Sequence, residues 1–249
     1  MLVLVPTFNE AENIRSVVLA VRSAMPGAQV LVIDDHSPDG TGEIADGLAA
    51  ADKGVSVLHR ESKDGLGAAY LAGFESGLAH GYDVLVEFDA DGSHPADVLP
   101  QLVAAVTGPA AERDNVGLAI GSRWVDGGSV VDWPRSRKIL SRGGNAYARI
   151  MLGLKVKDST AGCRAYRAET LRAIHLDLVK TKGYGFQVDM TRRTAACGFA
   201  IRELPITFRE RKYGESKMSR SIIVEAMWMV TLWGIERPFR YVQRAFSRR

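Results

Sequence analysis

The feature that most constrains the fold is an alternation of short apolar runs with helix-forming stretches, which continues as far as Ser122. The apolar runs read LVLVP, QVLVIDD, VSVLH, DVLVEFD and VGLAIGS, at 2–6, 29–35, 55–59, 83–89 and 116–122. The stretches between them, near 10–25, 41–51, 66–80 and 96–106, have helical composition. This spacing predicts βαβ units and a mostly parallel sheet, an α/β fold. Because the runs are apolar almost throughout, we expect helices on both faces of the sheet.

The pattern changes after Asp126. A loop leads to an expected helix at 136–152, followed by an apolar stretch at 162–167, a helix near 185–198 and a strand at 200–206. The C-terminal part reads as helix, with a break near Pro238. Since no linker interrupts the chain, we predict one α/β domain over 1–210 with a C-terminal helical extension over 211–249.

Composition narrows the class of protein. Hydrophobic residues make up 46% and charged residues 24% of the 249 positions, as in an ordinary folded protein. A net charge of +3 does not indicate a nucleic-acid partner. Cys163 and Cys197 form no disulfide framework and favour a reducing compartment. Pro6 interrupts the first apolar run, so we expect no signal peptide, and no stretch reaches the roughly 20 apolar residues of a transmembrane helix.

Polar residues gather where the apolar runs end, which is where ligands bind in open α/β sheets. These segments are Pro6-Thr7-Phe8-Asn9-Glu10, Asp34-Asp35, Asp89-Ala90-Asp91 and Gly121-Ser122-Arg123. The glycine-rich phosphate loops of dinucleotide-binding and P-loop proteins are absent. Asp89 and Asp91 are close enough to repel each other unless a cation or solvent relieves them. We therefore expect a hard cation such as Mg²⁺, held by carboxylates and substrate phosphates.

Other conspicuous residues have plainer interpretations. Asp34 and Asp39 are also suited to turns and helix caps. His36 and His94 are interpreted as turn residues beside the motifs. The glycines of GLGAAYLAGFESGL, at 65–78, favour close packing of a helix on the sheet.

Seven blocks in a fixed order carry a family resemblance. They are VPTFNEAENI (5–14), VIDDHSPDGT (32–41), GLGAAYLAGF (65–74), FDADGSHP (88–95), GSRW (121–124), SRGGNAYARIMLGLKVKDSTAGCRAYR (141–167) and RKYGESKMS (211–219). With them the chain resembles glycosyltransferase family 2 and, within it, the dolichyl/polyprenyl-phosphate mannosyltransferases. The resemblance implies a GT-A-type fold, the fold of nucleotide-diphospho-sugar transferases.

The resemblance also implies a donor site. The residues expected to bind the nucleotide sugar are Pro6, Phe8, Glu10, Ile33, Asp35, Asp89, Ala90 and Asp91. Asp89 and Asp91 match the D-x-D motif that holds Mg²⁺ or Mn²⁺ on the donor diphosphate. Ser93 stands where this branch often has Gln, so it is a further candidate ligand, with water as the alternative.

The reaction implied is transfer of mannose from GDP-mannose to a polyprenyl monophosphate, with inversion to a β-linked product. The acceptor phosphate is expected to contact Arg123, Arg137, Ser141, Arg164, Arg211 and Lys217. The residues expected to be catalytic are Asp89, Asp91, Arg123, Arg211 and Lys217. A phosphate monoester has its second pKa near 6, so the nucleophile is ionised and needs no strong base.

The C-terminal stretch favours a lipid acceptor. Its apolar run from Ile222 to Ile235 is too short to span a bilayer and is flanked by Arg residues and aromatic side chains. This composition is typical of a helix at a membrane interface; a core helix or an oligomer contact is the alternative. We expect a peripheral protein on the cytoplasmic face of a membrane, with the membrane surface and a membrane-embedded subunit or domain as partners.

Three other functions stay open at this point. A prenyl-phosphate glucosyltransferase that uses UDP-glucose has the same chemistry. A non-catalytic scaffold that binds nucleotide sugar would not need Asp89, Asp91 and Arg123 intact. A soluble acceptor would not need a membrane-binding C-terminal helix.

Overall fold

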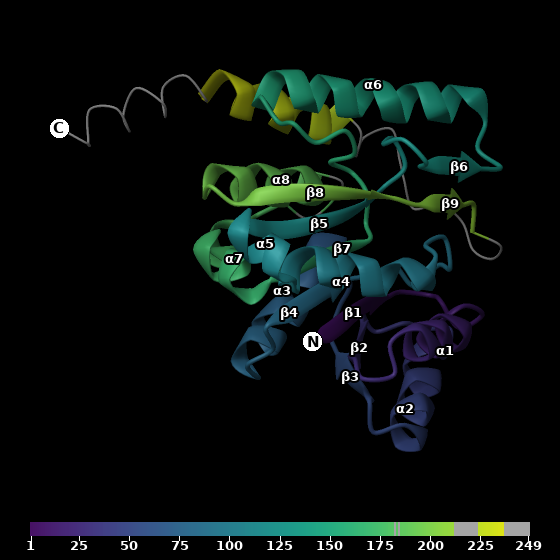
Figure 1. Cartoon of the computed structure of the whole chain (residues 1–249). Helices are drawn as coiled ribbons and strands as arrows, with labels where there is room; N and C mark the ends of the chain where they lie inside the picture. Colours follow the sequence, from purple (N-terminus) through teal and green to yellow (C-terminus); the bar gives the residue numbers. More distant parts are fainter. Residues whose placement is uncertain (182, 184, 212–223, 237–249) are drawn as a thin grey trace.

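The computed structural model describes residues 1–181, 183, 185–211 and 224–236. Within them, seven strands form one sheet (Figure 1). In sheet order these are β3 (Val55–His59), β2 (Gln29–Asp34), β1 (Leu2–Thr7), β4 (Val84–Glu87), β7 (Arg164–Arg167), β5 (Val116–Ser122) and β8 (Ala200–Pro205). Every neighbouring pair is parallel except those of β7, which runs antiparallel to both β4 and β5. The predicted mostly parallel sheet is confirmed.

Helices cover both faces of the sheet, as the continuous apolar strands predict. One face is covered by α1 (Ile14–Ala24), α2 (Thr41–Ala51), the 3₁₀ turn η1 (Ala96–Val98), α4 (Leu99–Thr107) and α5 (Pro109–Arg113). The other face is covered by α3 (Leu66–Ala79), α7 (Ala168–Ala173), the 3₁₀ turn η2 (Leu176–Leu178) and α8 (Gly185–Ala196). Successive side chains of β1 enter the two cores in turn, Val3 and Val5 on one face and Leu2 and Leu4 on the other.

The glycines of α3 allow this helix to lie close to the sheet. A Cβ atom on Gly73 would come within 2.6 Å of the Ile33 side chain, and one on Gly77 within 2.4 Å of Leu85. The predicted close packing is confirmed, and it brings the first turns of α3 up to the carboxyl ends of the central strands.

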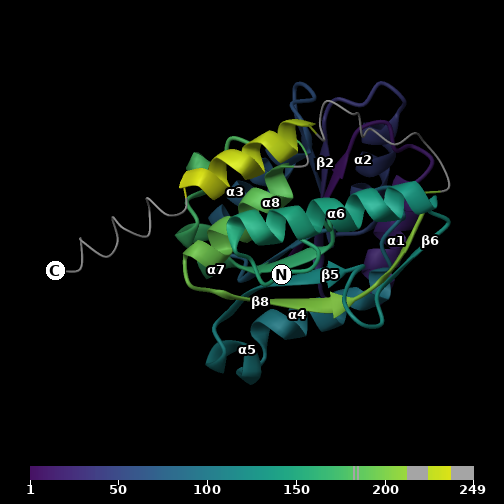
Figure 2. The same cartoon turned by 90° about the horizontal axis from the view of Figure 1, so that it is seen from above.

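Two helices lie side by side along one edge of the molecule, α6 (Arg135–Leu152) and a helix over 224–236 (Figures 1 and 2). Tyr147 and Thr231 join them through hydroxyl groups 2.7 Å apart. The guanidinium of Arg192 on α8 lies 4.6 Å from the ring centre of Trp233. Among the described residues, none of the helices combines the length and hydropathy that crossing a bilayer requires.

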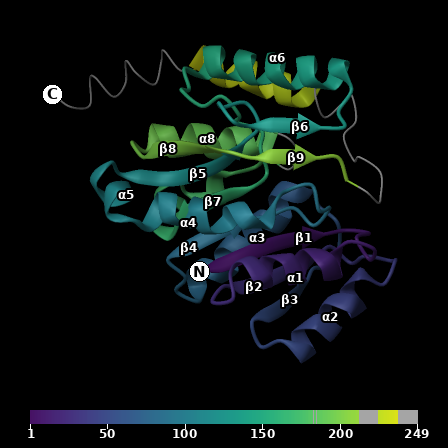
Figure 3. The same ribbon diagram turned by 45° about the vertical axis from the view of Figure 1, so that its right-hand side comes forward.

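A two-stranded parallel ribbon, β6 (Ser129–Val131) with β9 (Thr207–Arg209), lies beneath α6 (Figure 3). β9 continues the direction of β8 past the carboxyl edge of the sheet. Arg211, the second residue after β9, pairs with Asp91 in the loop that follows β4. The predicted break near Pro238 lies outside the described residues.

Candidate active site

The carboxyl ends of β2, β1 and β4 are neighbours in the sheet, so their loops form one continuous rim. Pro6 and Ile33 lie opposite each other in the β1–β2 register. The Phe88 N–H donates to the Leu4 carbonyl at 3.0 Å, which ties the start of the Asp89 loop to β1. The structure thus brings together the segments predicted to bind the nucleotide sugar.

The two aspartates of the D-x-D motif each have their own protein partners. Asp89 Oδ1 accepts a hydrogen bond from the Tyr70 hydroxyl at 2.9 Å, and Oδ2 lies 3.1 Å from His94 Nε2. Asp91 Oδ1 accepts from the Ser93 N–H at 2.9 Å, and Oδ2 pairs with Arg211 at 2.9 Å. Burial works to raise the pKa of Asp89, but hydrogen bonds and nearby charges, those of His94 first, hold it below its ordinary value. Asp89 is therefore an ionised carboxylate, and donors on the protein relieve the repulsion between the pair.

These carboxylates suit a hard divalent cation. Their side chains keep 27% and 11% of their surface exposed, so oxygen lone pairs remain accessible. Among the described residues there is no group of three or more His, Cys, Asp or Glu side chains that would hold a metal by itself. Two accessible carboxylates suit Mg²⁺ or Mn²⁺, which typically takes one or two carboxylates together with substrate phosphates. Ser93 is buried, and its described contacts are made by its backbone, so its hydroxyl as a third ligand stays a prediction.

On the donor side of the rim, Asp35 is buried and paired. Its Oδ1 accepts from Arg60 at 2.6 Å. Burial raises the pKa of Asp35 even though the Arg60 charge opposes this shift. Arg60 thus fixes one oxygen of the carboxylate and leaves the other for a ligand group.

Phe8 and Glu10 shape the neighbouring part of the rim. The Lys63 ammonium lies 3.9 Å from the centre of the Phe8 ring, a cation–π contact. Glu10 is buried, and its backbone N–H donates to the Thr41 hydroxyl at 2.9 Å. Ala90 is buried between the two aspartates. Binding of a nucleotide by Phe8, Glu10 and Ala90 stays a prediction.

Arg123 is committed to a buried carboxylate. Its backbone N–H and Nε donate to Asp158 Oδ2 at 2.9 and 2.7 Å, and an NH2 donor reaches Oδ1 at 2.7 Å. A further bond of 2.8 Å reaches the Thr160 hydroxyl. Burial works to raise the pKa of Asp158, but the charge of Arg123 and its hydrogen bonds together hold this pKa below its ordinary value. These hydrogen bonds position the segment from Asp158 to Thr160; contact of Arg123 with the acceptor phosphate stays a prediction.

Arg164 has no exposed surface, which contradicts the expectation that it binds the acceptor phosphate. Its guanidinium donates to the carbonyls of Ser159 at 2.7 Å and Ala161 at 2.6 Å. It also donates to the Gln187 carbonyl at 3.0 Å and lies 3.9 Å from the Glu87 carboxylate. Burial raises the pKa of Glu87 to about 8 despite this arginine. Arg164 is a core residue that fastens the 159–161 loop to β4 and α8.

The remaining acceptor candidates lie near the ribbon. Arg137 packs on the Trp133 ring at 4.0 Å and forms an ion pair with Glu210, next to Arg211. Ser141 is half-buried on α6, where its carbonyl accepts from Asn145 at 3.0 Å. The structure therefore brings Arg137 and Arg211 to the same end of the site. Lys217 lies outside the described residues.

Sequence reasoning missed four residues that organise this site. Tyr70 and His94 hold Asp89 through hydrogen bonds. Asp158 accepts hydrogen bonds from Arg123, and Asn145 Oδ1 accepts from the Ser159 N–H at 2.8 Å, so these two residues hold the segment 158–160 in place. Asp158 and Asn145 lie in the block 141–167 that carries the family resemblance, but no local sequence pattern indicates which residues they contact. A histidine directly after the D-x-D turn was visible, but its burial was not.

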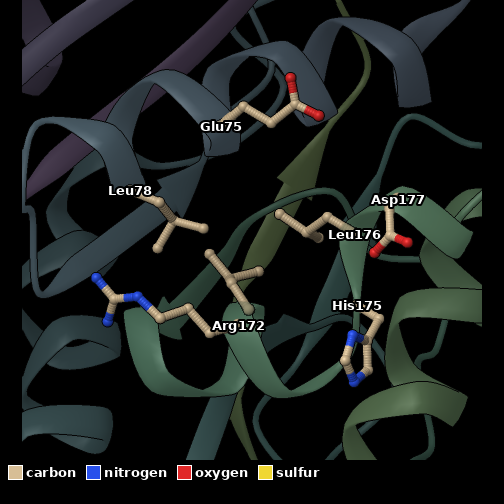
Figure 4. A pocket seen from close by; sticks show the side chains of 7 residues that line it. Glu75, Leu78, Arg172, His175, Leu176 and Asp177 are labelled. Atoms are coloured by element: carbon tan, nitrogen blue, oxygen red, sulfur yellow. The ribbon is translucent and has the colours of Figure 1, made fainter.

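One cavity lies away from this rim. It has a volume of about 360 Å³ and lies between the last turns of α3 and the α7–η2 segment (Figure 4). α3 leads into the start of β4, so this cavity is at the amino ends of the strands. It is therefore separate from the rim that carries Asp89.

Solved structures identify the class of fold. Glucosyl-3-phosphoglycerate synthase from Mycobacterium tuberculosis, in complex with Mn²⁺, UDP and glucosyl-3-phosphoglycerate, aligns with a TM-score of 0.65 at 22% identity. That alignment covers 95% of this chain and 78% of the other. A mannosyltransferase from Pyrobaculum calidifontis, in complex with GDP-Man and Mn²⁺, aligns with a TM-score of 0.58 at 17% identity, over 96% and 64% of the two chains. The fold is that of the GT-A glycosyltransferases, as predicted.

Sequence comparison gives the family. The family model described as Glycosyl transferase family 2 matches residues 2–174, and the chain belongs to this family. Undecaprenyl-phosphate mannosyltransferase from Micrococcus luteus is 57% identical over 235 residues, 94% of each chain. Polyprenol monophosphomannose synthase from Mycolicibacterium smegmatis is 54% identical over 94% of this chain and 86% of the relative. The predicted resemblance is confirmed.

Proposed function

We propose that this protein is an inverting glycosyltransferase that moves mannose from GDP-mannose to a polyprenyl monophosphate, giving a β-mannosyl phosphoryl polyprenol. The observation that carries the proposal is the pair Asp89 and Asp91 at the carboxyl rim of a family 2 fold. The names of two relatives above 50% identity support mannose as the sugar and a polyprenyl phosphate as the acceptor.

The chemistry follows from the charges of the two substrates. The acceptor oxygen attacks the anomeric carbon from the face opposite the nucleotide, and the bond to GDP breaks. Asp89 and Asp91 would hold Mg²⁺ or Mn²⁺, which neutralises the charge that develops on the departing diphosphate. Since the acceptor phosphate is ionised near neutral pH, the site needs no strong general base.

The acceptor phosphate needs cationic groups, and the positions of two arginines support this proposal. Arg211 contacts Asp91 directly. Arg137 forms an ion pair with Glu210, the residue that precedes Arg211. Both can present a planar pair of N–H donors to phosphate oxygens. Ser141, Arg123 and Lys217 remain candidates for further contacts.

A membrane surface would present the lipid acceptor. The helix over 224–236 exposes Val224, Trp228, Leu232 and Ile235 along one stripe, with exposed fractions of 41% to 68%. The neighbouring α6 exposes Ile139 and Ile150 at 72% and 74%, together with Arg142 and Arg149. Exposed apolar side chains among arginines suit the interface of an anionic leaflet. We therefore propose that these two helices rest on the cytoplasmic face of the membrane, with residues from 211 onward serving the acceptor.

The test is an incubation with radiolabelled GDP-mannose, UDP-glucose or UDP-galactose, a polyprenyl phosphate and Mg²⁺ or Mn²⁺. The proposal predicts a labelled lipid from GDP-mannose, with mannose β-linked to phosphate. A lipid product from UDP-glucose alone would instead identify a prenyl-phosphate glucosyltransferase. Absence of lipid product from every donor would overturn the proposed reaction.

A further inference from the structure

Both oxygens of the Asp89 carboxylate are held by buried side chains, whereas Asp91 is held by a backbone N–H and by Arg211. We propose that Tyr70 and His94 are positioning residues that fix Asp89 as the preset ligand for a divalent cation on a nucleoside diphosphate. This inference rests on the proposed role of Asp89 as a cation ligand. It assigns different tasks to the two aspartates of the motif.

The His94 side chain is buried in the core, and its imidazole contacts Asp89. Its side chain is 1% exposed, and its ring packs against Phe208 at 5.1 Å and Phe88 at 6.1 Å between centroids. Nδ1 is buried and has no hydrogen-bond partner among the described residues. Because Asp89 can only accept, Nε2 carries the proton and donates to it. Among the described residues, Asp89 is thus the one polar partner of the buried His94 imidazole.

Tyr70 approaches from the opposite side of the carboxylate. Its ring is fully buried on α3 and stacks against Phe74 and Phe186, with centroids at 6.3 and 6.1 Å. A buried phenol requires an acceptor, and Asp89 Oδ1 provides it at 2.9 Å. Stacking against two aromatic rings restricts the orientation of the Tyr70 ring and therefore of its hydroxyl.

The loop that contains Gly162 also limits rotation of the Asp89 carboxylate. A Cβ atom on Gly162 would lie 2.5 Å from Asp89 Oδ2, so a larger residue there would displace the carboxylate. Gly162 follows the loop that Arg164 fastens at Ser159 and Ala161. Asp89 is therefore confined by α3, by the turn after β4 and by this loop.

The confinement has a consequence for binding. A carboxylate has about four lone-pair sites, and the two hydrogen bonds leave the others for a cation. Groups that orient a metal ligand in this way typically contribute 10- to 100-fold in metal affinity. Loss of either donor is expected to let Asp89 turn away and to weaken cation binding without altering the ligand itself.

The test measures Mn²⁺ binding in the presence of GDP, by the electron paramagnetic resonance signal of free Mn²⁺. The variants are His94→Ala, His94→Gln and Tyr70→Phe; Asp89→Asn is the positive control and His80→Ala, at an exposed histidine, the matched control. We expect Mn²⁺ affinity to fall about 10- to 100-fold in His94→Ala and Tyr70→Phe, with most of it restored in His94→Gln, whose amide N–H replaces Nε2. GDP binding without metal should stay unchanged, and His80→Ala should match the wild type.

The outcomes separate this inference from the proposed function. If Asp89→Asn weakens Mn²⁺ binding and the folded His94→Ala and Tyr70→Phe variants do not, the positioning role is wrong and the metal site stands. If Asp89→Asn also binds Mn²⁺ normally, the proposed metal site is wrong. Equal losses in metal-free GDP binding and in melting temperature, with no rescue by His94→Gln, would show that these residues only support the core. Should His94→Ala fail to fold, Tyr70→Phe, which removes one oxygen atom, carries the test.

Discussion

Replacement of Arg164 by methionine distinguishes a core residue from a phosphate ligand. Methionine retains much of the length and volume of the side chain but has no N–H donors. The backbone carbonyls of Ser159 and Ala161 would lose the partner that Arg164 gives them at 2.7 and 2.6 Å. The Gln187 carbonyl would keep the Thr191 hydroxyl, which donates to it at 2.8 Å.

The size of the effect follows from these contacts. A buried acceptor left unpaired costs about 1–3 kcal/mol, so two carbonyls cost about 2–6 kcal/mol of unfolding free energy. Total stability is typically about 5–15 kcal/mol, so the loss is a large part of it. For a chain of this size, about 2–4 °C per kcal/mol gives a decrease in melting temperature of about 4–24 °C.

The assay compares thermal unfolding by circular dichroism with the KM for polyprenyl phosphate. Arg135→Met is the matched control, because Arg135 is exposed at the start of α6 and the substitution should leave unfolding within about 0.5 kcal/mol. An Arg164→Met protein that melts with the wild type and shows only a raised KM for the acceptor would refute the assignment. That result would restore the sequence-based expectation of a phosphate contact.

Three further substitutions test other parts of the fold. Because burial raises the pKa of Glu87 from 4.5 to about 8, folded protein keeps a proton that the unfolded chain loses in this range, and stability falls as pH rises. Glu87→Gln removes this titration. The unfolding free energy of the variant relative to the wild type, measured by chemical denaturation, should therefore rise by on the order of 4 kcal/mol between pH 4.5 and 8. A difference that stays constant over this range would contradict the assignment. Gly77→Ala should destabilise by about 1–3 kcal/mol through its clash with the sheet, whereas Gly47→Ala, in open space on α2, should be neutral or stabilising in the same melts. Arg123→Met should cost about 3–5 kcal/mol by leaving Asp158 buried without its partner, and Arg123→Met/Asp158→Asn should recover part of it; no recovery in denaturation would show the pair is uncoupled.

The sequence predicts the sheet well where strands are buried on both faces. The runs that became β1 to β5 are apolar almost throughout, so local composition marks them. β4 ends at Glu87, two residues earlier than the expected run, because the chain turns there into the aspartate loop. The direction of β7 between β4 and β5 is set by pairings far apart in the chain, which no local pattern records.

The same limit applies to the site. Asp89 and Asp91 stand at the end of one strand, so their spacing alone places them at the rim. Arginine is usually found at the surface, but Arg123 and Arg164 both pair with residues far along the chain. Arg123 binds Asp158, and Arg164 contacts Glu87 and Gln187. Neither pairing follows from spacing, so a contact with phosphate was the natural expectation for both. His94 looked like a turn residue for the same reason, because Phe208, which covers it, comes from β9.

The central claim is that the carboxyl rim at Asp91 supports divalent-metal-dependent transfer of mannose to a polyprenyl phosphate. The most direct measurement is the initial rate of mannosyl-lipid formation from GDP-mannose by the wild type and Asp91→Asn, each with Mn²⁺ or with EDTA. The account predicts product only from the wild type with metal, and a decrease of at least about 100-fold in the variant while its melting temperature is retained. A wild-type rate that survives EDTA, or a near-normal rate in Asp91→Asn, would contradict it.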